Sequence, residues 1–289
     1  PGRRRLPLPG YPFEHGHHEI PRPAAMPTAA DPLALPPRLA DPTDWFWLPV
    51  SREIPPPSVE AEAAGAIITG PVLILADALG VSAILADRLR ATGHGVTLVT
   101  PGSAFAAAEP GRFTLDPADP GQFRSLIAAL DAEPHTILHA WALEGAEAPA
   151  AGVETIAAVQ SRGLHALLHL LQALGSPGTG PERRLLVAAD RLLPVTDNDL
   201  RPDHAPLLGA AKIVSQEYDR ILCRMVDPGT AAPARLADIL LAELTEGAEA
   251  PRVTSWRGGR RFVGEEAPRR LTGDGRPRFV PGGVTVITG

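Results

Sequence analysis

Residues 71–100 read PVLILADALGVSAILADRLRATGHGVTLVT, and the order of their patterns indicates the fold class. A largely apolar run at 72–77 is followed by an amphipathic stretch at 81–92 and a second apolar run at 95–100. Short apolar runs are typical of strands buried on both faces, as in parallel sheets. Apolar residues at spacings of three and four predict a helix between the runs. The stretch therefore predicts a strand, a helix and a parallel strand.

The same alternation continues on both sides of this stretch. Further strands are predicted at 46–50, 136–141, 184–189 and 221–226, and helices at 120–132, 153–174, 204–219 and 233–246. Two short runs, 253–256 and 260–263, flank Gly258 and Gly259, which predicts a hairpin. We expect an α/β fold: a truncated doubly wound parallel sheet with a C-terminal hairpin.

The chain divides near Asp41. Residues 1–42 are rich in proline and have no sustained apolar period, which favours extended backbone and a linker. The chain has 289 residues, of which 44% are apolar. We expect one domain of roughly 200 to 250 residues after this linker.

Composition argues against several classes of protein. The net charge of −6 gives no reason to expect nucleic-acid binding. No run approaches the roughly 20 apolar residues that span a bilayer, and prolines rather than an apolar core follow Arg3–Arg5. We therefore expect a cytoplasmic protein that contacts no membrane. The single cysteine, Cys223, can form no internal disulfide and is interpreted as a buried small residue.

The first turn from strand to helix, ADALGVSA at 76–83, is where such a sheet normally binds a nucleotide. It has one glycine where a phosphate-binding loop needs several positions without a Cβ atom. Asp77 adds a negative charge that opposes phosphate. We expect this chain to bind no dinucleotide at that turn.

The residues that hydride transfer requires in this fold class are also missing. Tyr11 and Tyr218 are the two tyrosines, and the positions four residues after them are His15 and Leu222 rather than lysine. The one asparagine, Asn198, lies in a predicted loop. No serine lies in a Gly-x-Ser-x-Gly turn, so acyl transfer is not supported either. We predict no catalytic residues.

Two groups of histidines have spacings that could suit a metal. His15, His17 and His18 lie near Glu14 in the proline-rich segment, and His165 and His169 are one helical turn apart. The first group has no distant partner of suitable spacing, and the second has no evident third ligand. We predict no metal site.

Two features allow alternative interpretations. Trp45, Phe46 and Trp47 indicate a strand with inward-facing rings, or a platform for a ligand. Eight arginines between positions 252 and 278 outnumber three acids there. They indicate a docking face for another domain or a solvated hairpin.

Residues 283–289 read GVTVITG, a strand that runs into Thr288 and Gly289. This order opens the glycine-rich phosphate turn of a short-chain dehydrogenase, which needs further glycines and a helix N-terminus. We expect Thr288 and Gly289 to begin the cofactor motif of a catalytic half that continues after Gly289.

Several segments together resemble modular type I polyketide synthases. RRRLPLPGYPFE at 3–14 is similar to the end of the linker that follows the acyltransferase, although His15 onward departs from that motif. Segments similar to the structural subdomain of the ketoreductase are WFWLPV at 45–50, HAWAL at 139–143, GAAKIVSQEY at 209–218 and CRMVD at 223–227. The strand at 283–289 resembles the opening of the catalytic subdomain.

The resemblance implies a division of the chain and a set of partners. Residues 1–20 would end the post-acyltransferase linker, 21–43 would be a spacer, 44–280 the Rossmann-like structural subdomain, and 281–289 the first strand of the catalytic subdomain. The parent ketoreductase would use NADPH, and phosphopantetheine would be carried by a separate acyl carrier protein. Other implied partners are the catalytic subdomain in cis, the upstream ketosynthase–acyltransferase linker, which would bury Tyr11 and Phe13, and a second copy in a homodimer.

Three functions are therefore considered. The first is a non-catalytic structural subdomain that supports a β-ketoacyl reductase in polyketide biosynthesis. The second is part of a competent reductase whose active site lies after Gly289. The third is a stand-alone interaction module.

Overall fold

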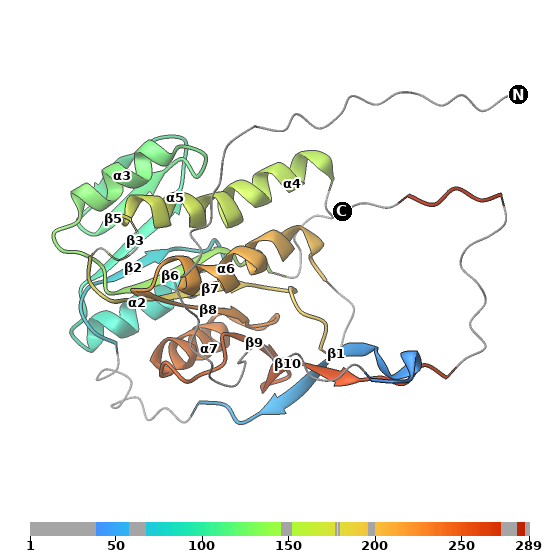
Figure 1. Ribbon diagram of the computed structural model, residues 1–289. Coiled ribbons are helices and arrows are strands. Elements are labelled where there is room, and N and C mark those ends of the chain that lie inside the picture. The colour runs from blue at the N-terminus through green and yellow to red at the C-terminus, as the bar shows by residue number, and fades with distance from the viewer. Residues whose placement is uncertain are drawn as a thin grey trace, which may run out of the picture.

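The computed structural model describes residues 39–57, 68–145, 152–176, 178, 180–195, 200–272 and 282–286. These residues form one sheet with helices on both faces (Figure 1). The strand order is β1-β10-β9-β8-β7-β6-β2-β3-β5-β4. The predicted Rossmann-like α/β fold is confirmed.

The centre of the sheet is parallel, as the apolar runs predicted. Its strands are β2 (Val72–Leu75), β3 (Val96–Pro101), β6 (Thr136–Ala142), β7 (Arg183–Ala189), β8 (Ile221–Asp227) and β9 (Val253–Arg257). Adjacent strands are parallel from β3 through β2, β6, β7 and β8 to β9. The chain leaves β2 towards β3 on one side and later returns to β6 on the other. The order therefore reverses beside β2, where doubly wound sheets bind ligands.

Alternate side chains of these strands enter two separate cores. Leu73 and Leu75 of β2 belong to the core under α3 (Pro120–Ala129), α5 (Ala166–Ala173) and α6 (Ala205–Glu217). Val72 and Ile74 belong to the opposite core, under α2 (Val81–Ala91) and α7 (Pro233–Thr245). Figure 1 shows α3, α5 and α6 on one face and α2 and α7 on the other. This alternation explains why the strand sequences are apolar throughout.

The predicted helix at 153–174 is interrupted in its middle. It consists of α4 (Val153–Gln160), the π-helical segment η2 (Ser161–His165) and α5. Within the turn of η2, the carbonyl oxygen of Gly163 accepts a hydrogen bond from Nε2 of His139 at 3.2 Å. The wider π turn leaves backbone carbonyls without the usual helical donor. A buried strand side chain uses one of them.

One edge of the sheet was not predicted. β4 (Ala106–Glu109) and β5 (Arg112–Leu115) form a hairpin, and β5 adds in parallel to β3. β4 is fully exposed and made mainly of alanine. Pro110 and Gly111 form a turn signal between the strands, but β4 has no apolar periodicity that would indicate a strand.

The other edge ends in a two-stranded ribbon, β1 (Trp47–Ile54) paired antiparallel with β10 (Arg260–Pro268). The short turn η1 (Pro42–Asp44) precedes it. The prediction of inward-facing rings is wrong: Trp45, Phe46 and Trp47 are 40%, 45% and 54% exposed. The reason is that this end of the ribbon extends beyond the helices, as Figure 1 shows, so no core lies beside it.

Some sequence-based predictions fall on other parts of the chain. Residues 1–38, which include Tyr11 and Phe13, lie outside the described residues, as do Thr288 and Gly289. Of the strand predicted near the end, residues 284–286 form no strand, because no neighbour pairs with them within the described residues. Val284 and Val286 are 85% and 80% exposed. No helix in the described ranges is long and apolar enough to cross a membrane.

Candidate functional site

The turn between β2 and α2 is closed by the carboxylate of Asp77. Its Oδ1 accepts hydrogen bonds from the backbone N–H of Leu79 at 2.8 Å and of Val81 at 3.1 Å. Its Oδ2 accepts from the backbone N–H of Ser82 at 2.7 Å and from the Ser82 hydroxyl at 2.5 Å. The carboxylate therefore binds the N–H groups that a helix N-terminus would offer to a phosphate. Gly80, with φ of +87°, provides the left-handed step that the turn requires.

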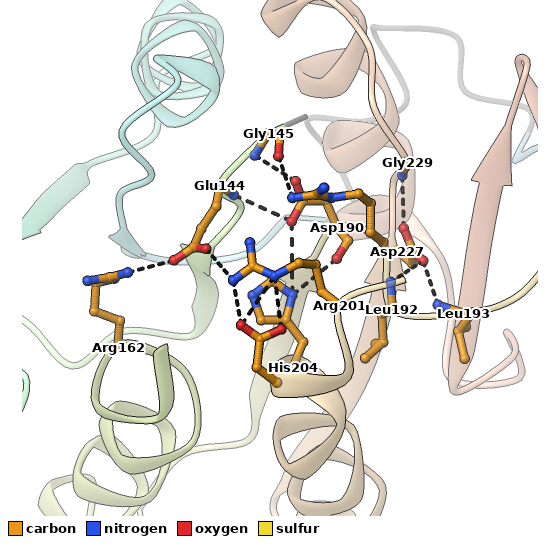
Figure 2. A network of polar contacts seen from close by, with 12 residues as sticks. Glu144, Gly145, Arg162, Asp190, Leu192, Leu193, Arg201, His204, Asp227 and Gly229 are labelled. Atoms are coloured by element: carbon orange, nitrogen blue, oxygen red, sulfur yellow. Dashed lines mark hydrogen bonds and ion pairs between the residues drawn. The ribbon is translucent and has the colours of Figure 1, made fainter. Parts of the chain in front are cut away.

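A network of ion pairs lies beyond the carboxyl end of β6 (Figure 2). Glu144 is bound by Arg162 of the π segment at 2.6 Å and by Arg201 at 2.9 Å. Arg201 also binds Asp203 at 2.5 Å, in the short turn η3 (Pro202–His204). Burial opposes ionisation of Glu144, but Arg162 and Arg201 together hold its pKa below the ordinary value. The pKa of Asp203 is also lowered, chiefly by its hydrogen bond from Arg201.

Asp190 lies directly after β7 and connects this network to the neighbouring loop. Its Oδ2 accepts from the backbone N–H of Gly145 at 2.6 Å, and its Oδ1 lies 4.0 Å from Nδ1 of His204. Burial raises the pKa of Asp190, although His204 and the nearby N–H groups favour the carboxylate. The next residue, Arg191, has φ of +52° and donates to the carbonyl oxygen of Gly145 at 2.8 Å. A left-handed non-glycine residue stores conformational strain.

Asp227, the last residue of β8, holds the loops after β7 and β8 together (Figure 2). It accepts from the backbone N–H groups of Leu192 and Leu193, both at 2.8 Å, and of Gly229 at 3.0 Å. Arg257 of β9 completes its shell with an ion pair at 2.9 Å. A fully buried carboxylate with this many donors serves to fix the backbone.

The arginines near the C-terminal hairpin have internal partners, which neither interpretation of them predicted. Arg257 binds Asp227, and Arg261 binds the buried Glu243 of α7 at 2.8 Å. Arg260 pairs with Glu53 across the ribbon. Arg276 and Arg278 lie outside the described residues. Where the structure describes them, several of these arginines fasten strands to each other and to α7.

Tyr218, which was considered for hydride transfer, lies away from this edge. Tyr218 follows α6 and precedes the start of β8, so it lies at the opposite, amino edge of the sheet from Asp77 and Asp190. Lys212 is exposed on α6. Cys223 is buried, and burial raises the pKa of its thiol to about 12. Asn198 lies outside the described residues.

Among the described residues, no group of three or more His, Cys, Asp or Glu side chains is arranged to hold a metal ion. His165 and His169 lie with ring centroids 6.5 Å apart, and Nδ1 of His169 is 3.2 Å from the carbonyl oxygen of Pro117. His15, His17 and His18 lie outside the described residues.

Sequence reasoning found the turn at Asp77 and missed the network around Glu144, Asp190, Asp203 and Asp227. A signal was present for three of these acids, since each lies at the carboxyl end of an apolar strand: Glu144 two residues after β6, Asp190 directly after β7 and Asp227 at the end of β8. Their partners, Arg162 and Arg201, come from a helix and a loop that no local pattern connects to those strands.

Comparison with protein families identifies residues 70–243, which run from just before β2 into α7. They match the family model described as beta-ketoacyl synthase-like, N-terminal, over more than half of the chain. The chain belongs to this family. Comparison with curated proteins gives no match.

Solved structures share the fold of this member of the beta-ketoacyl synthase-like family. One is the adenylation, ketoreductase and pseudo-Asub multidomain structure of a keto acid-selecting NRPS module, with TM-score 0.68 and 21% identity over 78% of this chain. A second is an N-terminal ketoreductase from the macrolactin assembly line, with TM-score 0.60 and 14% identity over 79% of this chain. The chain spans 18% and 45% of those two structures.

A short-chain dehydrogenase from Mycobacterium smegmatis has TM-score 0.51 and 14% identity, over 65% of this chain and 92% of that one. At these identities the likeness is one of fold. The family match and this shared fold agree with the resemblance to the ketoreductase region of polyketide synthases that the motifs indicated. The assignment of residues 1–20 to a post-acyltransferase linker stays a prediction.

Proposed function

We propose that this chain is the structural, non-catalytic half of an NADPH-dependent β-ketoacyl reductase in a type I polyketide synthase. The observation that carries the proposal is the turn after β2, where the carboxylate of Asp77 binds three backbone N–H groups and one hydroxyl. A sheet of this kind that retained the cofactor would leave those donors to the pyrophosphate.

The energetic argument against a dinucleotide has two parts. A phosphate at this turn would have to displace a carboxylate that already satisfies the donors. If the carboxylate stayed, two negative charges would share a site that is largely closed to water, where repulsion is strong. Asp77 is 8% exposed, so water screens this charge little. Both parts support a turn that stabilises α2 and binds no nucleotide.

The catalytic work then belongs to a second half of the same polypeptide. In this proposal Thr288 and Gly289 begin its NADPH-binding turn, and the catalytic serine and tyrosine follow. Its substrate is a β-ketoacyl group carried on the phosphopantetheine of an acyl carrier protein. An upstream ketosynthase–acyltransferase linker and a second copy of the synthase are the further partners.

The β1–β10 ribbon is the surface that this proposal assigns to the catalytic half. Trp47, Leu48 and Val50 are 54%, 49% and 41% exposed, and successive residues of a strand point to opposite faces. Both faces of the ribbon therefore carry apolar side chains without a core. A partner that covers the ribbon would remove this surface from water.

Calorimetric titration with NADPH tests the proposal. We expect no binding by this chain and binding by a chain extended through the second half, which provides the positive control. Micromolar binding by this chain would overturn the structural role. If the extended chain binds no NADPH and is not more stable than this one, the stand-alone interaction module becomes the better account.

A further inference from the structure

A cavity of about 350 Å³ lies outside the carboxyl ends of β2, β6, β7 and β8. Its wall includes Leu79 after β2, Leu143 and Gly145 after β6, and Asp190 after β7. The loop after β8 and the start of α7 form the opposite side. This volume is within the range of small-molecule sites, roughly 300–1,000 Å³. Asp77 therefore occupies the N–H groups that could bind a phosphate, but it leaves the cavity beside the turn open.

The chemistry of the wall is simple. Leu79, Leu143 and Leu236 contribute apolar surface, and Asp190 is the single ionisable residue that lines the cavity. A ligand with an aliphatic body would bury its chain against the leucines. Its polar group would have to donate a hydrogen bond to the carboxylate of Asp190 or carry a positive charge.

Asp190 has capacity for another donor. A carboxylate offers about four lone-pair positions. The contacts found are Gly145 N–H at 2.6 Å, a long approach of Glu144 N–H at 3.5 Å, and His204 at 4.0 Å. Asp190 is 2% exposed, and the cavity that it lines is the space from which a further donor can approach it. Burial outweighs these neighbours and the positive charge of Arg191, and it raises the pKa of Asp190, which is expected of a buried anion without full compensation.

Backbone strain is found at the same place. Arg191 is the only non-glycine residue in the described ranges with positive φ, and it binds the carbonyl oxygen of Gly145 on the cavity wall. Such strain is retained where the surrounding structure enforces it, and it is concentrated at binding sites.

We propose that this cavity binds a small aliphatic amine, with the ammonium group on Asp190 and the chain against Leu79, Leu143 and Leu236. The site is independent of NADPH and of the catalytic half. It selects against phosphates and carboxylates, because Asp190 presents a negative charge on the wall.

Calorimetric titration of this chain with hexylamine, hexanol and hexanoate tests the site. The three probes share a six-carbon chain and differ in the head group. We expect hexylamine to bind most tightly and hexanoate at least about tenfold more weakly, the ratio for one additional ion pair of about 1.4 kcal/mol. Equal binding of hexylamine and hexanoate, or no binding of hexylamine, would overturn the proposal.

Substitutions locate the binding. Ala231→Trp places a ring in the cavity from an exposed position of the loop before α7, and Leu79→Trp does so from the opposite wall. Each should weaken hexylamine binding by about tenfold or more, the effect of losing roughly two buried methylene groups. Ala129→Trp, at an exposed position of α3, is the matched control and should change nothing.

Asp190→Asn should lower the affinity for hexylamine to that for hexanol. If this variant does not fold, the two tryptophan variants and the three six-carbon probes still test whether the amine binds in this cavity. Unchanged hexylamine binding in both tryptophan variants would place the amine elsewhere and refute the site.

Discussion

The carboxyl edge of the sheet and the β1–β10 ribbon reverse the usual distribution of charge and apolar surface. At the carboxyl edge, the side chains of Asp203 and Asp227 are fully buried and ion-paired. In the ribbon, Trp47 is 54% exposed, while the pair between Glu53 and Arg260 lies in water. The edge pairs most of its buried carboxylates with arginines or backbone N–H groups, whereas the ribbon leaves apolar side chains exposed.

Under the proposed structural role, this difference assigns separate tasks to the two regions. At the carboxyl edge, the carboxylates of Asp77, Glu144 and Asp227 bind backbone N–H groups or arginines that fix loops, which leaves little capacity for a phosphate. The ribbon exposes Trp47, Leu48 and Val50, the surface that the proposed function assigns to the catalytic half. Stability and association are therefore assigned to different regions, and substitutions can test each separately.

The largest effect is expected for Asp227→Ala. The change leaves Arg257 and three backbone N–H groups without their acceptor, and removing one partner of a buried pair costs about 3–5 kcal/mol of the free energy of unfolding. Urea denaturation measures it. Glu53→Ala removes the exposed acceptor of Arg260 in the ribbon and should change stability little. A similar loss in both variants would contradict the contrast between the regions.

Asp77→Ala should lower the free energy of unfolding by about 2–3 kcal/mol. It removes the acceptor for the first turn of α2, which combines the loss of a cap with buried unsatisfied N–H groups. Asp119→Ala is the matched control, because Asp119 caps α3 from an exposed position. Its effect should be clearly smaller in the same denaturation series. Comparable losses would show that the Asp77 turn is an ordinary cap.

Acid should destabilise the body of the sheet through His139. Burial lowers the pKa of this histidine to about 4 from an ordinary value of 6.5. The folded state therefore keeps the ring neutral, while the unfolded state takes up a proton below pH 6.5. Stability is full above that pH and is lost as the pH falls towards 4, by about 2 kcal/mol at pH 5 relative to pH 7.

The comparison for this pH effect is His139→Gln against His165→Gln. The first variant should lose much of the pH dependence between pH 7 and 5, while the second, at an exposed position of η2, should keep it. Thermal unfolding at several pH values gives the readout. Identical pH profiles in the wild type and His139→Gln would exclude His139 as the cause.

The smallest effect is expected in the ribbon. Trp47→Ser should change the free energy of unfolding of this chain by less than about 0.5 kcal/mol, since the ring contacts no core. In a chain extended through the catalytic half, the same substitution should lower the melting temperature by several degrees, because the ring is then buried. Leu48→Ser tests the opposite face. If neither variant depends on the length of the chain, the ribbon does not bind the second half.

The body of the fold could be predicted because its strands and helices are strongly patterned. The predicted limits of β2, β3, β6, β7 and β8 agree with the structure to within two residues at each end. The hairpin β4–β5 was missed because four residues such as Ala106–Glu109 carry no β-type pattern. The prediction for Trp47 failed for another reason: an aromatic strand indicates a core, and the sequence does not show that the sheet continues past its helices there.

The site was only partly predictable. The turn at Asp77 could be recognised because it is local, with one glycine and one acid within eight residues. The contacts of Asp227 could not be recognised from the sequence, since Leu192 and Arg257 lie 35 and 30 residues away from it. The left-handed backbone of the buried Arg191 gave no signal either, because its tertiary contacts impose that conformation.

The register of the ribbon has a mechanical consequence. Trp47, where the chain enters β1, is paired with Pro268, where it leaves β10, and the pairing continues to Ile54 and Arg261. Tension between the segments before β1 and after β10 would therefore break the backbone pairing of the ribbon sequentially, starting at Trp47 and Pro268. The two cores under the helices would carry none of this load until the ribbon had separated. Separation of the ribbon alone would leave both of these cores packed.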